Sequence, residues 1–535
     1  MNDIYDLAIK LYHEGRYNDT RTIIKVILPH HNKSGDVYNT LGMVEQNLNN
    51  YKEAYELFKF ANILEPDNKH YKNNLENIEK NNHILNMSNT STNVSTHKSS
   101  NKPTVIISGH IPIDNSGYSN QTFYLAKILI EQGYNVTIIG WNATGLKDFQ
   151  FKELTFNDIM FIYKNLINFD EYLVKNQEKI PILEQLTYFT ALEPSFPCFI
   201  QDNQYYDIIV NKINPKFIVF IQDIYVMKFS RFLCPTITWL PIHSEPLDKL
   251  CMESVSKFDS IVTLSEFGKK QVLNKFSDKS VTIIPHIIDD ELFYEIDELN
   301  YKANLRKQYN ISEEAYVCLL ISNNSEPENR KAFDVNLGGF ADFQKNNKNA
   351  HLHIHTNVNL AFKIMDYLKE CDVPENKYTV CDQTKYKKKG YSDKEVADLY
   401  RMSDVLLYST CVEGFGLPML EAQSCGCPVI VNNFSTPPEY TKYGIICEIE
   451  QMVYKEDFDA YTSMPSRSNL VEALEEMITW DDAKHYKLKM ETKEFLKEFT
   501  YQKIKESWID HIKAFEKQHQ KSDDTIDLNQ KLFLR

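Results

Sequence analysis

Long apolar runs are absent from this sequence. No window approaches the ~18 to 20 uninterrupted apolar residues that a membrane-spanning helix needs. The first residues, MNDIYDLAIKLYHEG, carry acidic side chains and lack the apolar run of a signal peptide. We therefore expect a soluble, cytoplasmic protein without a transmembrane segment, for which peripheral membrane contact stays open.

Paired cysteines and an excess of basic residues are also missing. The 10 cysteines are scattered without CxxC spacing, which favours buried reduced thiols over a disulfide framework or a zinc site. The formal net charge of -15 argues against a general nucleic-acid-binding protein. A hydrophobic content of 42% is typical of a folded chain, and 535 residues exceed one domain of about 150 residues.

A repeat signal stands at the N-terminus. Tyr17 and Tyr51 are 34 residues apart, and each follows a short polar turn and precedes a helical stretch. The second copy has large residues, small residues and a closing proline in the tetratricopeptide order: Tyr38, Leu41, Gly42, Ala54, Phe58, Ala61 and Pro66. Residues 1–84 therefore resemble a short tetratricopeptide module, with a generic helical hairpin as the alternative. Because fewer than three full repeats are marginally stable, we expect contact with a protein partner, a second copy or the next domain.

Two α/β domains are predicted after a polar linker. The segment from Asn86 to Lys102 is rich in Ser, Thr and Asn, which predicts a flexible linker. Residues 103–110 form a β-branched run typical of a buried strand, followed by an apolar helix ending at Gly133 and a second strand at 135–141. The same alternation of apolar strands and helices continues to residue 285 and begins again at residue 316. It predicts two doubly wound parallel sheets with a ligand cleft between them. The predicted organisation is helical repeats at 1–84, a linker at 85–102, an N-terminal Rossmann-like acceptor domain at 103–297, a C-terminal Rossmann-like nucleotide-sugar domain at 298–480, C-terminal helices packing back towards the first of these at 481–520, and a tail at 521–535.

The stretch EGFGLPMLEAQSCGCPVI places two glutamates, Glu413 and Glu421, around a glycine-bearing turn. Pro418 fits a first helical turn and Gly426 fits a C-terminal stop, so a helix is expected over residues 418–425. Glycines let the backbone N–H groups of the turn approach a ligand, and carboxylates accept strong hydrogen bonds from vicinal hydroxyls. This pattern suits a polyol ligand. The alternative is a pair of ordinary surface residues on a strand-to-helix loop.

This E-x7-E stretch resembles the signature of the family-4 retaining glycosyltransferases. Further segments resemble the same family: YSDKEVADLYRMSDVLLYSTCVEGFGLPMLEAQSCGCPVI, NFSTPPEYTKYGIIC, VTIIPHIIDDELF, SIVTLSEFGKK and SGYSN. The resemblance covers roughly residues 103–515. It implies the α/β GT-B fold, two facing Rossmann-like domains, here preceded by an all-α repeat module.

The resemblance also implies roles for individual residues. Glu421 would hold the ribose hydroxyls of a nucleotide sugar, while Glu413 and the backbone of Gly414, Phe415, Gly416 and Leu417 would hold the transferred sugar. Arg330 and Lys331 would grip the diphosphate, since fixed cations can stabilise a departing nucleoside diphosphate without a metal. The implied co-substrate is a UDP- or GDP-sugar, with no required cofactor and no metal site. One departure stands out, because many members have an arginine where this chain has Glu326.

Two histidines, a glycine and an acidic triplet lie outside these motifs. His243 ends a predicted strand and could face the donor or the acceptor, and Gly117 could let a glycine loop close over the diphosphate. His286 is interpreted as structural. The triplet from Asp457 to Asp459 spells D-x-D, a metal motif of another glycosyltransferase architecture, and is interpreted as a chance match in an acidic loop.

The predicted function is retaining transfer of a sugar to an acceptor hydroxyl on a glycan, lipid or protein, by front-face displacement as the family implies. Two alternatives stay open: an inverting protein O-glycosyltransferase, which the repeats ahead of a GT-B pair resemble, and a non-catalytic repeat scaffold. The donor base, the donor sugar and the acceptor cannot be identified from the sequence.

Overall fold

The chain forms two separate units. The computed structural model describes residues 2–27, 34–48, 51–66, 68–80, 102–113, 116–141, 153–163, 176–190, 203–222, 232–326, 328–388 and 390–533. One unit spans Met1–Asn101 and the other Lys102–Arg535. Almost all of the predicted linker, residues 85–101, lies outside the described residues.

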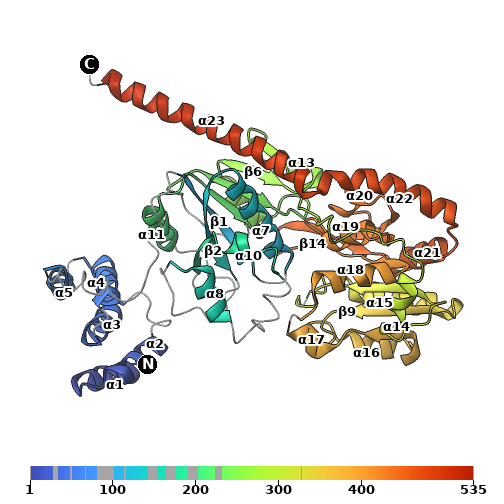
Figure 1. The fold of residues 1–535 in the computed structure, drawn as a ribbon, viewed down its shortest axis with the longest axis horizontal. Helices are drawn as coiled ribbons and strands as arrows, with labels where there is room; N and C mark the ends of the chain where they lie inside the picture. Colours follow the sequence, from blue (N-terminus) through green and yellow to red (C-terminus); the bar gives the residue numbers. More distant parts are fainter. Residues whose placement is uncertain are drawn as a thin grey trace. The chain divides into compact units, whose positions relative to one another are not determined.

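The first unit is helical throughout its described part, as predicted (Figure 1). Its helices are α1 Asn2–His13, α2 Tyr17–Ile27, α3 Gly35–Asn47, α4 Tyr51–Leu64 and α5 Lys69–Lys80. Gly42 lies against the Phe58 ring, where a Cβ atom would come within 2.7 Å of Cδ1. The small residue at this position therefore lets α3 and α4 pack closely, as a tetratricopeptide pair requires.

Hydrogen bonds join α1 to α3 and α3 to α5 at a constant separation along the sequence. Four of them link residues that are 35 positions apart: Tyr5 to Thr40, Asn47 to Tyr12, Tyr71 to Asp36 and Asn74 to Asn39. A constant sequence separation is expected when structural repeats stack on their neighbours. Because these bonds recur from α1 to α3 and from α3 to α5, they agree with stacked repeats at close to the 34-residue spacing of Tyr17 and Tyr51.

The first sheet of the second unit has seven parallel strands in the order β3-β2-β1-β4-β5-β6-β7. The strands are β1 Thr104–His110, β2 Asn135–Trp141, β3 Thr187–Thr190, β4 Ile218–Ile221, β5 Thr236–Leu240, β6 Ser260–Thr263 and β7 Val281–Ile283. The helices are α7 Gly117–Glu131, α8 Phe156–Tyr163, α10 Ile180–Leu183, α11 Asn203–Ile213, α12 Lys249–Val255 and α13 Glu266–Lys275. Buried β-branched residues on both faces account for this parallel sheet.

The second sheet has six parallel strands in the order β10-β9-β8-β11-β12-β13. The strands are β8 Tyr316–Ile321, β9 Ala350–His355, β10 Tyr378–Val380, β11 Val405–Leu407, β12 Val429–Asn432 and β13 Gly444–Cys447. The helices are α14 Tyr301–Gln308, α15 Phe333–Asn346, α16 Ile364–Glu370, α17 Gln383–Lys387, α18 Asp393–Met402, α19 Leu417–Ser424, α20 Pro437–Tyr440 and α21 Arg467–Met477. Two doubly wound, Rossmann-like sheets are therefore present, as predicted. The chain reverses its strand order between β8 and β11, the place where such sheets bind ligands.

The last long helix, α23, returns to the first sheet, whereas α22 before it packs on α19 of the second domain (Figure 1). After α22, Asp482–Leu496, the helix α23, Tyr501–Phe533, places Trp508 edge-to-face against Trp239 with ring centroids 5.1 Å apart. Glu516 forms an ion pair with Lys216 at 2.6 Å. The backbone of α23 continues to Phe533 and so passes through most of residues 521–535, which the sequence predicted to be a tail. None of the described helices is long and apolar enough to cross a bilayer.

An antiparallel hairpin follows the second sheet. It consists of β14 Ile449–Lys455 and β15 Ala460–Pro465. Tyr461 exchanges main-chain hydrogen bonds with Glu245 of the first Rossmann-like domain, at 3.2 and 2.7 Å. Ser463 donates through its backbone N–H to the carbonyl of Cys411 in the second domain, at 3.1 Å. The hairpin therefore contacts both domains.

Candidate functional site

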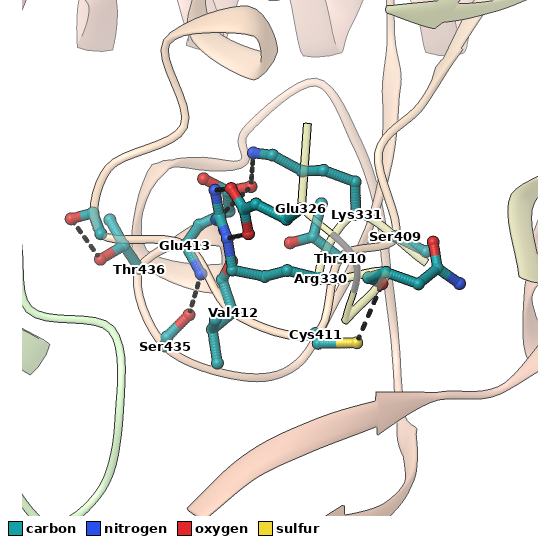
Figure 2. Close-up of polar contacts among 12 residues, drawn as sticks. Glu326, Arg330, Lys331, Ser409, Thr410, Cys411, Val412, Glu413, Ser435 and Thr436 are labelled. Carbon is teal, nitrogen blue, oxygen red and sulfur yellow. Dashed lines mark hydrogen bonds and ion pairs between the residues drawn. The ribbon is translucent and has the colours of Figure 1, made fainter. Parts of the chain in front are cut away.

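Three loops converge at the reversal point of the second sheet. They follow the neighbouring strands β8, β11 and β12, and Figure 2 shows their side chains gathered around Glu413. The β8 loop contributes Arg330 and Lys331, the β11 loop Glu413, and the β12 loop Ser435. The structure thus brings together Arg330, Lys331 and Glu413, which are up to 83 positions apart in the sequence (413 − 330).

Lys331 and Glu413 form a buried ion pair. The Lys331 ammonium donates to Glu413 Oε1, and the two side chains are 12% and 7% exposed. Burial raises the pKa of Glu413, but the charges of Lys331 and Arg330 outweigh burial and hold that pKa below its ordinary value. The pKa of Lys331 is lowered by burial, and the charge of Glu413 only partly offsets this effect. The lowered pKa of Glu413 favours the ionised form of this carboxyl group beside Lys331.

Arg330 is held by three groups. Its Nε and Nη2 atoms donate to the two carboxylate oxygens of Glu326, at 2.6 and 2.7 Å. Its Nη1 atom donates to the carbonyl of Val412 at 3.1 Å and lies 3.7 Å from Glu413 Oε1. Burial opposes the charge of Arg330, but Glu326 and Glu413 raise its pKa above the ordinary value. Arg330 is therefore a fixed cation within the cluster.

Buried polar side chains fix the loops that carry the cluster. Asn336, on α15, donates to the carbonyl of Ser409 at 2.7 Å and to that of Lys331 at 3.2 Å. Asn432 accepts from the Thr410 N–H at 2.8 Å. The backbone N–H of Glu413 donates to Ser435 Oγ at 3.1 Å (Figure 2). The sequence interpretation missed these side chains, although polar residues just after a strand or on the buried face of a helix were the available signal.

The turn after Glu413 leads into α19, which begins one residue before the predicted start. Gly416 precedes the helix with φ of 93°, a conformation that favours glycine, and Gly426 follows the helix with φ of 78°. Glu421 lies on α19 and accepts a hydrogen bond from the Tyr400 hydroxyl at 2.9 Å. Burial raises the pKa of Glu421 to about 7. A neutral and an ionised form of this carboxyl group therefore both exist near neutral pH.

Two of the predicted glycines lie at the contact between the two Rossmann-like domains. A Cβ atom on Gly117, the first residue of α7, would come within 2.7 Å of Leu417 Cδ1. A Cβ atom on Gly414 would collide with the Pro241 side chain and lie 3.2 Å from its Cα atom. Burial raises the pKa of Glu326, but Arg330 and, more weakly, Lys331 and His243, two residues after Pro241, hold that pKa below its ordinary value. The predicted residues from the two domains thus lie together.

We predict that Gly414→Ala destabilises the second unit. A rigid proline ring cannot yield to the added methyl group, so the overpacking should cost about 1–3 kcal/mol. Thermal unfolding of the full chain would show this as a lower midpoint. Gly117→Ala is the matched control, because the flexible end of Leu417 can move aside. A Gly414→Ala midpoint equal to that of the control would contradict the close contact with Pro241.

Two other residues join the domains near the site. Glu439 accepts hydrogen bonds from the backbone N–H groups of Glu266 and Phe267, at 2.9 and 2.6 Å, at the start of α13. A carboxylate at a helix N-terminus is favourable because of the partial positive charge there. His286 is packed between Trp239 and Phe415, with ring centroids 4.7 and 5.0 Å away, and burial lowers its pKa to about 3. Its surroundings are those of an uncharged, packed ring.

The D-x-D triplet lies at the turn of the β14–β15 hairpin. Asp459, which has φ of 52°, accepts a hydrogen bond from the Tyr454 hydroxyl at 2.6 Å. Among the described residues, no group of three or more His, Cys, Asp or Glu side chains is arranged to hold a metal ion.

Two segments of the chain match known protein families. Residues 302–456 match the family described as "Glycosyl transferases group 1", and residues 40–68 match "Tetratricopeptide repeat". The first segment includes Arg330, Lys331, Glu413 and Glu421. These two segments are therefore similar to a glycosyltransferase group 1 domain and to a tetratricopeptide repeat.

One curated relative is similar over a short segment. O-antigen chain mannosyltransferase B of Escherichia coli is 45% identical over 51 residues, which are 9% of this chain. The matched segment spans only 13% of the length of that relative.

Solved structures are similar to this chain over 77–78% of its length. A glycosyltransferase of Rickettsia africae has a TM-score of 0.53 at 13% identity, over 78% of this chain and 99% of its own. Sucrose-phosphate synthase of Thermosynechococcus elongatus has a TM-score of 0.55 at 13% identity, over 77% of this chain and 98% of its own. An Anabaena protein in complex with UDP and glucose has a TM-score of 0.50 at 13% identity, over 77% and 100%. These likenesses show the fold, which is GT-B with an N-terminal helical module, as predicted.

Proposed function

We propose that this protein is a retaining glycosyltransferase that moves a sugar from a nucleoside-diphosphate sugar to an acceptor hydroxyl. The observation that carries the proposal is the convergence of Arg330, Lys331 and Glu413 at the reversal point of the second sheet. Cations suit a diphosphate, and a carboxylate beside them suits sugar hydroxyls. The matched glycosyltransferase group 1 segment, which contains all three residues, supports the same activity.

Donor binding would be divided between the two glutamates. In this proposal Glu421 accepts hydrogen bonds from the ribose, with Tyr400 orienting its carboxyl group. Glu413 and the backbone from Gly414 to Leu417 hold the transferred sugar. The hydrogen bond from the Glu413 N–H to Ser435 fixes the start of that turn. A preorganised turn loses little conformational entropy when the donor binds.

The chemical step requires stabilisation of a leaving diphosphate. As the bond from the anomeric carbon to the phosphate oxygen breaks, negative charge grows on the diphosphate. Arg330 and Lys331 are fixed cations in a largely buried site, where such charge is stabilised more strongly than in water. The leaving phosphate oxygen then accepts the proton of the acceptor hydroxyl, which attacks the same face of the sugar and retains the anomeric configuration. His243 lies on the first-domain side and would contact the acceptor or the donor sugar.

The comparisons support particular donors. UDP and glucose are bound to the Anabaena structure, and the Escherichia coli relative is named as a mannosyltransferase. Nucleotide-diphosphate hexoses, with UDP or GDP as the carrier, are therefore the first donors to test. The acceptor is a hydroxyl of a glycan, a lipid or a protein, and the tetratricopeptide match supports a protein partner or protein acceptor for the repeat module.

A donor screen tests the proposal. Purified full-length protein is incubated with UDP- and GDP-hexoses and candidate acceptors, and nucleotide release is measured. We expect acceptor-stimulated release from one donor, with a product whose anomeric configuration by NMR equals that of the donor. Inversion would contradict the retaining mechanism and favour the protein O-glycosyltransferase alternative. Failure to bind or cleave any donor would favour a non-catalytic scaffold.

A further inference from the structure

Glu326 occupies the side of Arg330 on which an oxyanion would bind. The Nε and Nη2 atoms of an arginine form its bidentate edge for carboxylates and phosphates. Both atoms donate to Glu326, at 2.6 and 2.7 Å, while Nη1 donates to the Val412 carbonyl (Figure 2). A phosphate could use this edge only after Glu326 has left it.

The charges of the cluster also cancel. Arg330 and Lys331 contribute two positive charges, and Glu326 and Glu413 contribute two negative charges. A diphosphate that approached this arrangement would meet no net positive charge, although its binding requires one. Displacing one carboxylate would restore the missing positive charge.

Exposure indicates which carboxylate can be displaced. The Glu326 side chain is 40% exposed, whereas that of Glu413 is 7% exposed. A carboxylate that is already partly hydrated can turn into water at little cost, but a buried one cannot. In addition, Glu326 belongs to the segment between β8 and α15 and lies in neither element.

We propose that Glu326 is an internal counter-ion that occupies the phosphate-binding edge of Arg330 and is displaced when the diphosphate of the donor binds. The inference rests on the proposed function and adds a residue that sets donor affinity. Because the same carboxylate returns to Arg330 when the product leaves, it also weakens the hold on the released nucleoside diphosphate. Glu326 acts through Arg330 and is not a catalytic residue.

Isothermal titration of the full-length protein with UDP and with GDP tests this role. Glu326→Gln keeps the shape of the side chain and removes its charge, so we expect about tenfold tighter binding of whichever nucleotide binds the wild type. The inhibition constant of that nucleotide in the transfer reaction should fall by the same factor. A gain in affinity distinguishes this role from a structural one, because damage to the site would not produce it.

Two control variants accompany the test. Glu328→Gln removes the same charge from an exposed position in the same loop and should leave the affinity within about twofold of the wild type. Arg330→Gln should weaken binding, which shows that the nucleotide engages this arginine. Unchanged or weaker binding by Glu326→Gln, beside a wild type that binds, would overturn the inference and leave the proposed function standing. A wild type that binds neither nucleotide would overturn both.

Discussion

Replacing Lys331 by methionine is expected to reduce sugar transfer by about 10²- to 10³-fold, the effect of removing one group that stabilises developing negative charge. The same change removes the hydrogen-bonded partner of the Glu413 carboxylate, whose side chain is only 7% exposed, and leaves it with Arg330 at 3.7 Å. Breaking a buried ion pair on one side costs about 3–5 kcal/mol of folding free energy. Transfer rates and denaturant unfolding of the same preparation would measure both losses.

The double variant Lys331→Met with Glu413→Gln separates the two effects. Neutralising both partners removes the buried carboxylate that lost its hydrogen-bonded cation, so most of the lost stability should return, whereas transfer should stay low. Lys345→Met is the matched control, because Lys345 lies on the neighbouring helix α15 in an exposed pair with Asp342 and should cost less than about 1 kcal/mol. Wild-type transfer by Lys331→Met would remove this lysine from the proposed chemistry.

Replacing Glu421 by glutamine is expected to stabilise the protein above neutral pH and to weaken donor binding. The pKa of Glu421 is raised by burial from its ordinary 4.5 to about 7, so the folded protein binds this proton more tightly than the unfolded chain does. The bound proton therefore contributes its full stability below the pKa of the unfolded chain, 4.5. This contribution is lost as the pH rises through the pKa of the folded protein, about 7. The loss amounts to about 3 kcal/mol. Glutamine avoids that loss and can still accept the hydrogen bond from Tyr400.

Thermal unfolding across this pH window would measure the effect. The variant should be more stable than the wild type by an amount that grows between about pH 5 and pH 7 and is constant above. Tyr400→Phe should move this dependence to higher pH, because the Tyr400 hydrogen bond lowers the pKa of Glu421. A Glu421→Gln variant with wild-type donor affinity would contradict the assignment of Glu421 to the ribose. A stability difference that is independent of pH would contradict the raised pKa.

The two parallel sheets were predictable because buried strands leave a clear signal. The β-branched run at β1 and the apolar runs at β8 and β12 have few polar interruptions, as strands buried on both faces require. The short edge strand β3 and the hairpin β14–β15 gave no comparable signal. In β14 the side chains are mostly partly or fully exposed, so its composition resembles that of a loop.

Within the candidate site, the sequence identified charged residues but not how they pair. The motif around Glu413 and the adjacent cations Arg330 and Lys331 were evident from spacing and resemblance. The pairing of Arg330 with Glu326 could not be predicted from the sequence, because it depends on the path of an irregular loop between β8 and α15. The role of Asn336 was also hidden, since only the folded chain shows which carbonyl groups its amide reaches. The donor and catalytic roles of these residues remain predictions.

The hairpin β14–β15 limits how the two Rossmann-like domains can move against each other. Near Tyr461 it is joined to Glu245, two residues after His243, and near Ser463 to Cys411, two residues before Glu413. Any separation of the domains at this point must break two main-chain hydrogen bonds between Tyr461 and Glu245. Opening that preserves these bonds is a rotation with its pivot beside the hairpin. The distance between the two site loops then stays nearly constant during such a rotation.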